Sequence, residues 1–158
     1  MTLYFVRHTD ALPGLDDASR PLSPKGITDA ARIGKYLKLR GVRPGAAYTS
    51  PLLRAKQTLQ GILAECARGQ PPVMREDDAL LNETLPDAFS GWLRAQVNGE
   101  DTLLIGHSPT IGERVATLLR MKDPLALHFS KGAIACLETE DCRRARLEFF
   151  LRLPDLPY

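Results

Sequence analysis

The chain of 158 residues lacks the features that define several protein classes. Its apolar runs all fall short of the ~20 residues that a helix needs to cross a bilayer, and no charged leader followed by an apolar segment opens it. The 21 Lys and Arg residues nearly balance the 19 Asp and Glu residues, for a net charge of +2, and no basic block stands out. We therefore expect a cytoplasmic protein with no membrane and no nucleic-acid partner.

Cysteine is also scarce. Cys66, Cys136 and Cys142 make an odd number and lack the spacing of a metal site. Cys136 and Cys142 could face one another across a hairpin, but a reduced pair fits a cytoplasmic protein better. The length and the 44% of hydrophobic residues suit one folded domain with a sizeable core, and we expect this domain to cover residues 1–158.

Apolar runs rich in strand-forming residues alternate with longer stretches of helical period, which is typical of an α/β fold. We expect a three-layer α/β/α sandwich whose mostly parallel sheet ends in an antiparallel hairpin near the C-terminus. The expected strands cover residues 2–7, 46–49, 73–75, 102–105, 133–139 and 144–151. The expected helices cover residues 24–39, 51–67, 86–97 and 109–120.

The first helix is marked most clearly. Ser23 is a suitable N-cap, Pro24 occupies the first helical position, and Gly41 follows the end. Apolar residues recur along it at helical spacing: Ile27, Ala30, Ala31, Gly34 and Leu37. For the third helix we expect a buried set of four: Phe89, Trp92, Leu93 and Val97.

Two of the three histidines stand where predicted strands end. Arg7-His8 closes the first apolar run, and Gly106-His107 closes a later one. Loops that lead to helices follow both units, so in a parallel sheet both units end on the same edge. Ligands of open α/β sheets bind outside that carboxyl edge, where the strand order reverses.

Arg7 and His8 are neighbours, and adjacent residues of a strand point to opposite faces of the sheet. The two side chains can therefore share a pocket only if the chain bends after the strand. The turn-forming residues that follow, Thr9-Asp10 and then Pro13-Gly14, favour such a bend.

A third segment lies between the two histidine units. It runs Ser50-Pro51-Leu52-Leu53-Arg54-Ala55-Lys56-Gln57-Thr58, a strand-to-helix turn that carries Arg54 in the first turn of the helix. A neutral imidazole is a good nucleophile toward phosphorus when a backbone acceptor fixes one ring nitrogen and the other is free. Neighbouring cations favour this neutral form, guanidinium groups hold phosphoryl oxygens through forked hydrogen bonds, and helix N-termini near Pro51 and Pro109 add N–H groups. The set is typical of a site that traps a phosphoryl group.

Single residues carry less weight than this set. A lone histidine is usually structural, and His128, which stands alone near Phe129, is interpreted as a surface or core residue. Trp92 and Phe89 are interpreted as core residues rather than as stacking groups for a ligand.

The three motifs together resemble the signature of the histidine phosphatase (phosphoglycerate mutase-like) superfamily. The segment Arg20-Pro21-Leu22-Ser23-Pro24-Lys25-Gly26 is similar to one in its small SixA-type phosphohistidine phosphatase branch, and the resemblance extends from Leu3 to about Leu119. It implies that His8 is the nucleophile and becomes transiently phosphorylated. It also implies that three further residues bind the phosphoryl group: Arg7, Arg54 and His107. By this resemblance, neither a metal nor another cofactor is needed.

The chain departs from the family pattern at one position. Many members have glycine after the Arg-His pair, whereas this chain has Thr9, which makes the loop less permissive. The small branch tolerates other residues here, so the departure does not indicate an inactive protein.

A phosphate ester expels a poor alkoxide leaving group, and a general acid then commonly contributes ~10²–10⁴-fold. Leu81-Asn82-Glu83 is similar to the Leu-Asn-Glu segment of the mutase and ester-phosphatase members, which makes Glu83 the candidate proton donor. The alternative is a surface residue of the loop or a cap of the helix that starts near Pro86. Asp77 and Asp78 are weaker candidates for the acid.

Three residues are candidate substrate contacts. Asp17 and Arg20 lie in the loop after His8, close enough to line the mouth of the pocket, and Ser108 directly follows His107. For Asp17 and Arg20 the alternative is a local salt bridge that shapes the loop.

The leading hypothesis is a metal-independent phosphatase that hydrolyses phosphohistidine on a protein through a covalent phosphohistidine enzyme intermediate. Imidazole leaves easily, so this substrate needs no strong acid, and the chain has few residues for a lid beyond residues 76–90. An uncovered site suits a phosphoryl group that a protein surface presents. The alternative is a phosphomonoesterase for a small phosphorylated metabolite or nucleotide, which Glu83 favours.

Two further hypotheses are disfavoured. A mutase needs a closed pocket, and a non-catalytic phosphate-binding domain would be expected to lose the nucleophile first. The partner protein or metabolite and the oligomeric state stay open.

Overall fold

The computed structural model describes residues 1–67, 69–96 and 98–157. One six-stranded sheet has the order β3-β2-β4-β1-β5-β6. Its strands are β1 (Thr2–Arg7), β2 (Ala46–Thr49), β3 (Met74–Glu76), β4 (Thr102–Gly106), β5 (Ile134–Thr139) and β6 (Ala145–Leu151). The first four strands are parallel, whereas β5 runs antiparallel to β1 and β6 antiparallel to β5. The expected parallel sheet with a C-terminal hairpin is confirmed.

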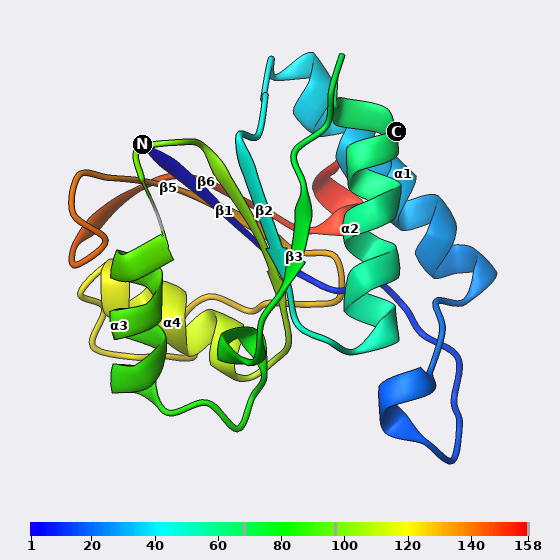
Figure 1. The fold of residues 1–158 in the computed structure, drawn as a ribbon, viewed down its shortest axis with the longest axis horizontal. Helices are drawn as coiled ribbons and strands as arrows, with labels where there is room; N and C mark the ends of the chain where they lie inside the picture. Colours follow the sequence, from blue (N-terminus) through cyan, green and yellow to red (C-terminus); the bar gives the residue numbers. More distant parts are fainter. Residues whose placement is uncertain (68, 97, 158) are drawn as a thin grey trace.

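Helices cover both faces of the sheet. Figure 1 shows helices on both sides of the sheet, in pairs that pack in two separate cores, so the three-layer architecture is also confirmed. The first pair is α1 (Pro24–Leu39) and α2 (Leu53–Cys66), and the second pair is α3 (Pro86–Gln96) and α4 (Thr110–Leu118). Three short 3-10 helices complete the described elements: η1 (Asp17–Ser19), η2 (Asp78–Leu80) and η3 (Leu153–Asp155).

The central strand β1 feeds two separate cores. Tyr4 and Val6 pack with α1 and α2, while Leu3 and Phe5 pack with α3 and α4. All four side chains are buried, because successive residues of a strand point to opposite faces and both faces are covered. This burial fixes the position of the end of β1, where the candidate nucleophile follows.

The inward face of α1 matches the predicted one at Ala30, Gly34 and Leu37, which are buried, and differs from it at Ile27. Ile27 is 60% exposed, while Asp29, Ala30 and Ile33 are buried. α1 approaches α2 closely, since a Cβ added to Gly34 would lie 2.5 Å from the carbonyl oxygen of Ile62. The contact is therefore centred on small residues, whereas Ile27, in the first turn of α1, is exposed.

The other element boundaries shift by one or two residues. α2 begins at Leu53 and α4 at Thr110, later than predicted, because the residues before each form a turn. β3 begins at Met74, and Val73 is exposed. In α3, Phe89 and Leu93 are buried, and the half-buried Trp92 donates a 2.8 Å hydrogen bond to Asp77. The predicted buried Val97 lies outside the described residues.

The three cysteines are free and buried. Cys136 packs in the core against α1 and α2, whereas Cys142 packs in the core against α3 and α4. The sheet therefore separates these two thiols. In the described part of the chain, no helix has both the length and the apolar character that a bilayer span requires.

Candidate active site

The two histidine units meet at the carboxyl edge of the sheet. β1 and β4 are neighbours, and their register pairs Arg7 with Gly106. The backbone N–H of His8 donates to the carbonyl of Gly106 over 3.1 Å. The rings of His8 and His107 follow directly, and their centroids lie 5.1 Å apart. Both rings are buried, so the expected juxtaposition of the two imidazoles is found.

The His8 ring is held by the backbone of the next residue. Its Nδ1 lies 2.7 Å from the carbonyl oxygen of Thr9. A carbonyl can only accept, so Nδ1 carries the proton and donates it, and the neutral ring keeps its lone pair on Nε2. This is the tautomer that a nucleophilic imidazole requires.

Thr9, the departure from the family pattern, serves this arrangement. Its N–H donates to the Thr58 hydroxyl over 3.1 Å, and its own hydroxyl donates to the carbonyl of Gly26 over 2.8 Å. A Cβ added to Gly26 would lie 2.0 Å from the carbonyl oxygen of Asp10. The loop is thus clamped against α1 and α2 by a side chain that glycine could not supply.

Arg7 reaches the same edge because the chain leaves the strand after it. The N–H of Gly132 donates to the carbonyls of both Arg7 and His8, over 3.0 and 3.2 Å, and Gly132 has φ +76°, which glycine adopts without strain. The Arg7 Nη1 donates to the carbonyl of Phe129 over 2.9 Å. The segment before β5 therefore orients Arg7.

Arg54 lies in the first turn of α2, as predicted, and is buried. Its Nη1 donates to the backbone carbonyl of Asp17 over 2.9 Å, and its Nη2 pairs with the Asp17 carboxylate over 3.2 Å. Arg20 pairs with the same carboxylate over 3.1 Å and donates from Nε to the carbonyl of Leu12. Asp17 thus belongs to the site through Arg54, whereas Arg20 shapes the loop.

His107 is fixed by Ser50, a residue that the sequence analysis did not assign to the site. The Ser50 hydroxyl lies 2.6 Å from Nε2 of His107 and accepts from the N–H of Leu52 over 3.3 Å. A hydroxyl that accepts from the backbone can donate to Nε2, which places the ring proton on Nδ1. This Nδ1 and the Nε of Arg7 are buried atoms with no hydrogen-bond partner among the described residues. A tetrahedral anion has the acceptors that such donors lack.

The site holds both histidines in the neutral form. Burial, with smaller contributions from the nearby guanidinium groups of Arg54 and Arg7, lowers the pKa of His8 to about 4, against the opposing hydrogen bond to Thr9. Burial also lowers the pKa of His107 to about 3, with His8 and Arg54 acting in the same direction. Burial and neighbouring cations disfavour a positive charge on imidazole, so His8 keeps its lone pair available at neutral pH.

Lys131 is a further cation that the sequence did not reveal. It forms a 2.8 Å ion pair with Asp10, and its charge contributes to the lowered pKa of His8. It lies on the turn before β5, next to Gly132. In sequence it stands far from the histidine motifs, and only the pairing of β5 with β1 brings it to this edge.

Two predicted residues lie beside this cluster. Glu83 is exposed, and its carboxylate makes no hydrogen bond or ion pair with any residue that the structure describes. Its neighbour Asn82 donates to the carbonyl of Ser108 over 2.9 Å and accepts from the Thr110 hydroxyl over 2.7 Å. The Ser108 side chain is exposed. The loop that carries Glu83 is thereby anchored next to His107. No group of three or more His, Cys, Asp or Glu side chains that could hold a metal ion occurs within the described ranges.

Comparison with known proteins agrees with this geometry. Residues 3–100 match the profile of the histidine phosphatase superfamily (branch 1). The phosphohistidine phosphatase SixA of Escherichia coli (strain K12) is 29% identical over 148 residues, which cover 89% of this chain and 87% of that protein. The solved structure of the protein histidine phosphatase SixA complexed with tungstate superimposes with a TM-score of 0.88 at 28% identity, over 99% of both chains.

A second group of relatives matches a shorter stretch. The 2,3-bisphosphoglycerate-dependent phosphoglycerate mutase of Bartonella bacilliformis is 44% identical over 89 residues. These residues cover 52% of this chain and 41% of the mutase. The similarity to the mutase therefore concerns half of the chain, whereas the similarity to SixA extends over almost all of it.

Proposed function

Because this chain belongs to the histidine phosphatase superfamily, on its SixA branch, and is a phosphatase, we propose that it hydrolyses phosphohistidine on a partner protein. The arrangement of His8 carries the proposal. Its Nδ1 is engaged by the carbonyl of Thr9 at 2.7 Å, and its Nε2 is left as a lone-pair donor beside His107 and two guanidinium groups. The similarity to SixA over the full length supports the choice of substrate.

In the first step, the Nε2 lone pair of His8 attacks phosphorus and forms a P–N bond. The P–N bond of the substrate breaks, and its electron pair goes to the leaving imidazole, which takes up a proton from solvent. Arg7 and Arg54 stabilise the charge on the equatorial oxygens, because forked, charge-assisted hydrogen bonds strengthen as charge develops there. The Nδ1–H of His107 donates to a third oxygen.

In the second step, water attacks the phosphorus of the phosphorylated His8. The P–N bond to Nε2 breaks and its electron pair returns to His8, a proton of the attacking water passes to solvent, inorganic phosphate leaves, and neutral His8 is restored. The net reaction consumes one water and returns the partner's histidine. These two reaction steps need only water and four residues of the site: His8, Arg7, Arg54 and His107.

The alternative substrate is a small phosphate ester, and one observation favours it. Asn82 anchors the loop that carries Glu83 to the carbonyl of Ser108, directly after His107. An exposed carboxyl group on that loop could protonate an alkoxide. The three buried free thiols fit a reducing compartment, and we place the reaction in the cytoplasm in either case.

Replacing Glu83 by Gln separates the two substrates. If ester hydrolysis is the natural task, its kcat falls by ~10²-fold or more, because the alkoxide then leaves without its proton. Phosphohistidine hydrolysis changes little, since imidazole leaves as a neutral or easily protonated group. Turnover of a phosphohistidine peptide and of sugar phosphates, whose leaving group is an alkoxide, measures the difference. Glu140→Gln, at an exposed carboxylate between β5 and β6, is the matched control.

Two results together would favour phosphohistidine. The wild-type kcat/KM for the peptide should exceed the values for the esters, and Glu83→Gln should leave the value for the peptide nearly unchanged. Equal losses on peptide and ester would contradict the proposed order of substrates. A loss confined to the sugar phosphates, together with a poor rate on the peptide, would assign the chain to the ester phosphatases.

The lowered pKa values predict an unusual pH dependence. An imidazole with the ordinary pKa of ~6.5 is mostly protonated at pH 5, whereas His8 and His107 should stay neutral until pH approaches about 4 and about 3. Nitrogen NMR shifts of the two rings, assigned by His8→Gln and His107→Gln, measure this directly. A midpoint near 6 for either ring would contradict it. Because the unfolded chain takes up these protons first, the free energy of unfolding should also decline as pH falls from 6.5 toward 4.

A further inference from the structure

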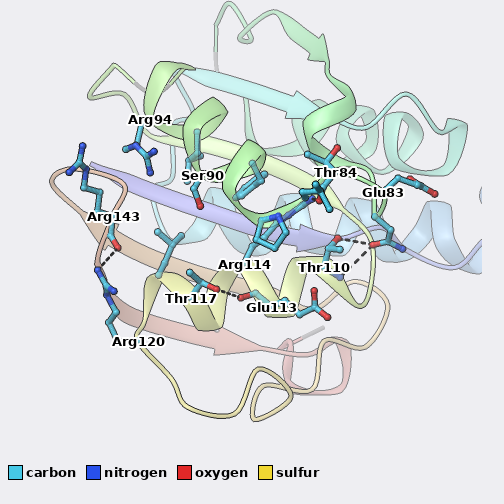
Figure 2. Close-up of a pocket in the computed structure, with 16 residues that line it drawn as sticks. Glu83, Thr84, Ser90, Arg94, Thr110, Glu113, Arg114, Thr117, Arg120 and Arg143 are labelled. Atoms are coloured by element: carbon cyan, nitrogen blue, oxygen red, sulfur yellow. Dashed lines mark hydrogen bonds between the residues drawn. The ribbon is translucent and has the colours of Figure 1, made fainter.

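A groove of about 480 Å³ lies between α3 and α4, beside the candidate active site. Figure 2 shows Glu83 and Thr110 at one of its ends and Arg94, Arg120 and Arg143 at the other. The first end adjoins the site, because Asn82 bonds both Thr110 and the carbonyl of Ser108. The groove thus leads from the edge of the phosphate site along the helix pair to an arginine cluster, which we define as Arg94, Arg120 and Arg143.

The charges of the groove are uneven. The arginine cluster comes from three different elements: α3, the end of α4 and the turn between β5 and β6. No carboxylate of the described chain lies within ion-pairing distance of these three side chains, and all three are exposed. The two acidic lining residues, Glu83 and Glu113, stand outside this cluster in Figure 2. Asp141, whose carboxylate accepts from the backbone N–H groups of Arg143 and Arg144, offsets part of the charge of Arg143. With three guanidinium groups, the far end still carries an excess of positive charge.

A fourth arginine forms the floor between the two ends. Arg114 is 7% exposed, and its guanidinium group lies 4.2 Å from the ring centroid of Phe89. It donates to the carbonyls of Leu81 and Thr84, over 2.9 and 3.5 Å, and also lacks a carboxylate partner among the described residues. Backbone carbonyls satisfy its donors but do not neutralise its charge, so it adds to the field of the groove.

We propose that this groove docks an acidic segment of the protein that carries the phosphohistidine, and that the arginine cluster binds its carboxylates. The inference rests on the proposed function and specifies the partner. A site for a small anion encloses most of its ligand, whereas the cluster is exposed on the rim of an open groove, as suits a protein surface. A phosphoryl group alone contacts too little area for a stable protein complex, which buries about 800 Å² per partner.

The geometry sets where the acidic residues should stand. α4 has nine residues and is therefore ~14 Å long. An extended segment covers this length with four to five residues at ~3.3 Å each. Carboxylates should therefore favour binding when they lie about four to seven residues from the phosphohistidine. Directly beside the phosphohistidine they should not help, because Glu83 stands near that end.

Three synthetic phosphohistidine peptides test this arrangement, each made in both chain directions. The first carries four Asp or Glu residues at positions four to seven from the phosphohistidine, the second carries Asn and Gln there, and the third carries the acids directly beside the phosphohistidine. We expect kcat/KM to be about 10-fold higher for the first peptide than for the other two. The difference should lie in KM and should become smaller at high salt. Equal kcat/KM for all three would overturn the proposal.

Charge reversal at the groove is the second test of the docking proposal. Arg94→Glu with Arg143→Glu should remove the preference for the first peptide and leave the turnover of phosphoramidate, which reaches only the phosphate site, within twofold. Lys35→Glu with Arg43→Glu makes the same change in charge away from the groove, on exposed residues of α1 and of the loop before β2. An equal loss in this control would assign the effect to overall charge and contradict docking.

Arg120→Gly guards against a folding artefact. Arg120 follows the end of α4 with φ +57°, and Met121 donates to the carbonyl of Ala116 there, in the arrangement that glycine usually occupies. The variant should keep or raise the melting temperature while reducing the preference for the first peptide. A lowered preference with a lowered melting temperature would count against a direct role.

Binding of the unphosphorylated peptides keeps this proposal distinct from the proposed function. Fluorescence anisotropy should show tighter binding of the acidic peptide than of its neutral counterpart, and loss of the difference in the Arg94→Glu, Arg143→Glu variant. This result would stand even if the chain hydrolysed only esters. If ATP bound in the same arginine-dependent way and the acidic peptide did not, the groove would be a site for a small anion and docking would be excluded.

Discussion

Replacing His8 by alanine should lower phosphatase turnover by ~10⁴-fold or more and abolish the covalent intermediate. The lone pair on Nε2 is the nucleophile of the proposed reaction, and no residue substitutes for a missing nucleophile at this distance. The neighbouring His107 cannot do so, because its Nε2 is engaged by the Ser50 hydroxyl at 2.6 Å. Arg7 and Arg54 would still bind phosphate, so the variant should keep much of its affinity for inorganic phosphate.

The intermediate gives this prediction a readout beyond the rate. Wild-type protein mixed with radioactive phosphoramidate and quenched in alkali should carry phosphorus on one histidine, in a bond that acid breaks. His8→Ala should carry none. His128→Ala, a change at an exposed histidine on another loop, is the control and should label like wild type. Labelling of the His8→Ala protein, or full activity without any label, would overturn the covalent mechanism.

The fold could be predicted from the sequence because both faces of the sheet are covered. In β1 the unbroken apolar run from Leu3 to Val6 indicates a strand buried on both sides, and the structure buries all four residues. The inward face of α1 could be predicted only in part. Its contact with α2 depends on the missing Cβ of Gly34, 2.5 Å from a carbonyl of Ile62 if it were present. The spacing places Gly34 inward but does not show that its missing Cβ sets the distance between the helices, and it also places the exposed Ile27 inward.

The candidate site also contains both residues that the sequence predicts and residues that it does not. Arg7, His8, Arg54 and His107 stand at strand ends or in a first helical turn, where the local pattern alone places them on one edge. Ser50 and Lys131 reach the site through tertiary contacts. Ser50 has a signal in retrospect, since it directly follows β2 on the edge where β1 and β4 end. Lys131 has none, because its approach depends on the antiparallel pairing of β5 with β1.

The second large effect is expected at Arg54. Arg54→Ala should reduce kcat/KM by ~10³-fold, since two charge-assisted hydrogen bonds to the phosphoryl group, each ~2 kcal/mol, are lost together. Arg54→Lys should recover only part of this loss, because an ammonium group cannot form the fork. Arg43→Ala, an exposed arginine away from the site, is the matched control. The melting temperature of each variant separates lost chemistry from lost structure.

Asp17 should respond in the opposite direction, because its carboxylate occupies the same guanidinium group that the phosphoryl group needs. In the structure Asp17 pairs with Arg54 over 3.2 Å and is itself 65% exposed, so solvent weakens the pair. Asp17→Asn should therefore tighten inhibition by inorganic phosphate by a few-fold, while the Arg54→Ala, Asp17→Asn double variant should bind phosphate no better than Arg54→Ala. If Asp17→Asn instead weakened phosphate binding through a wild-type Arg54, Asp17 would orient the arginine rather than compete for it.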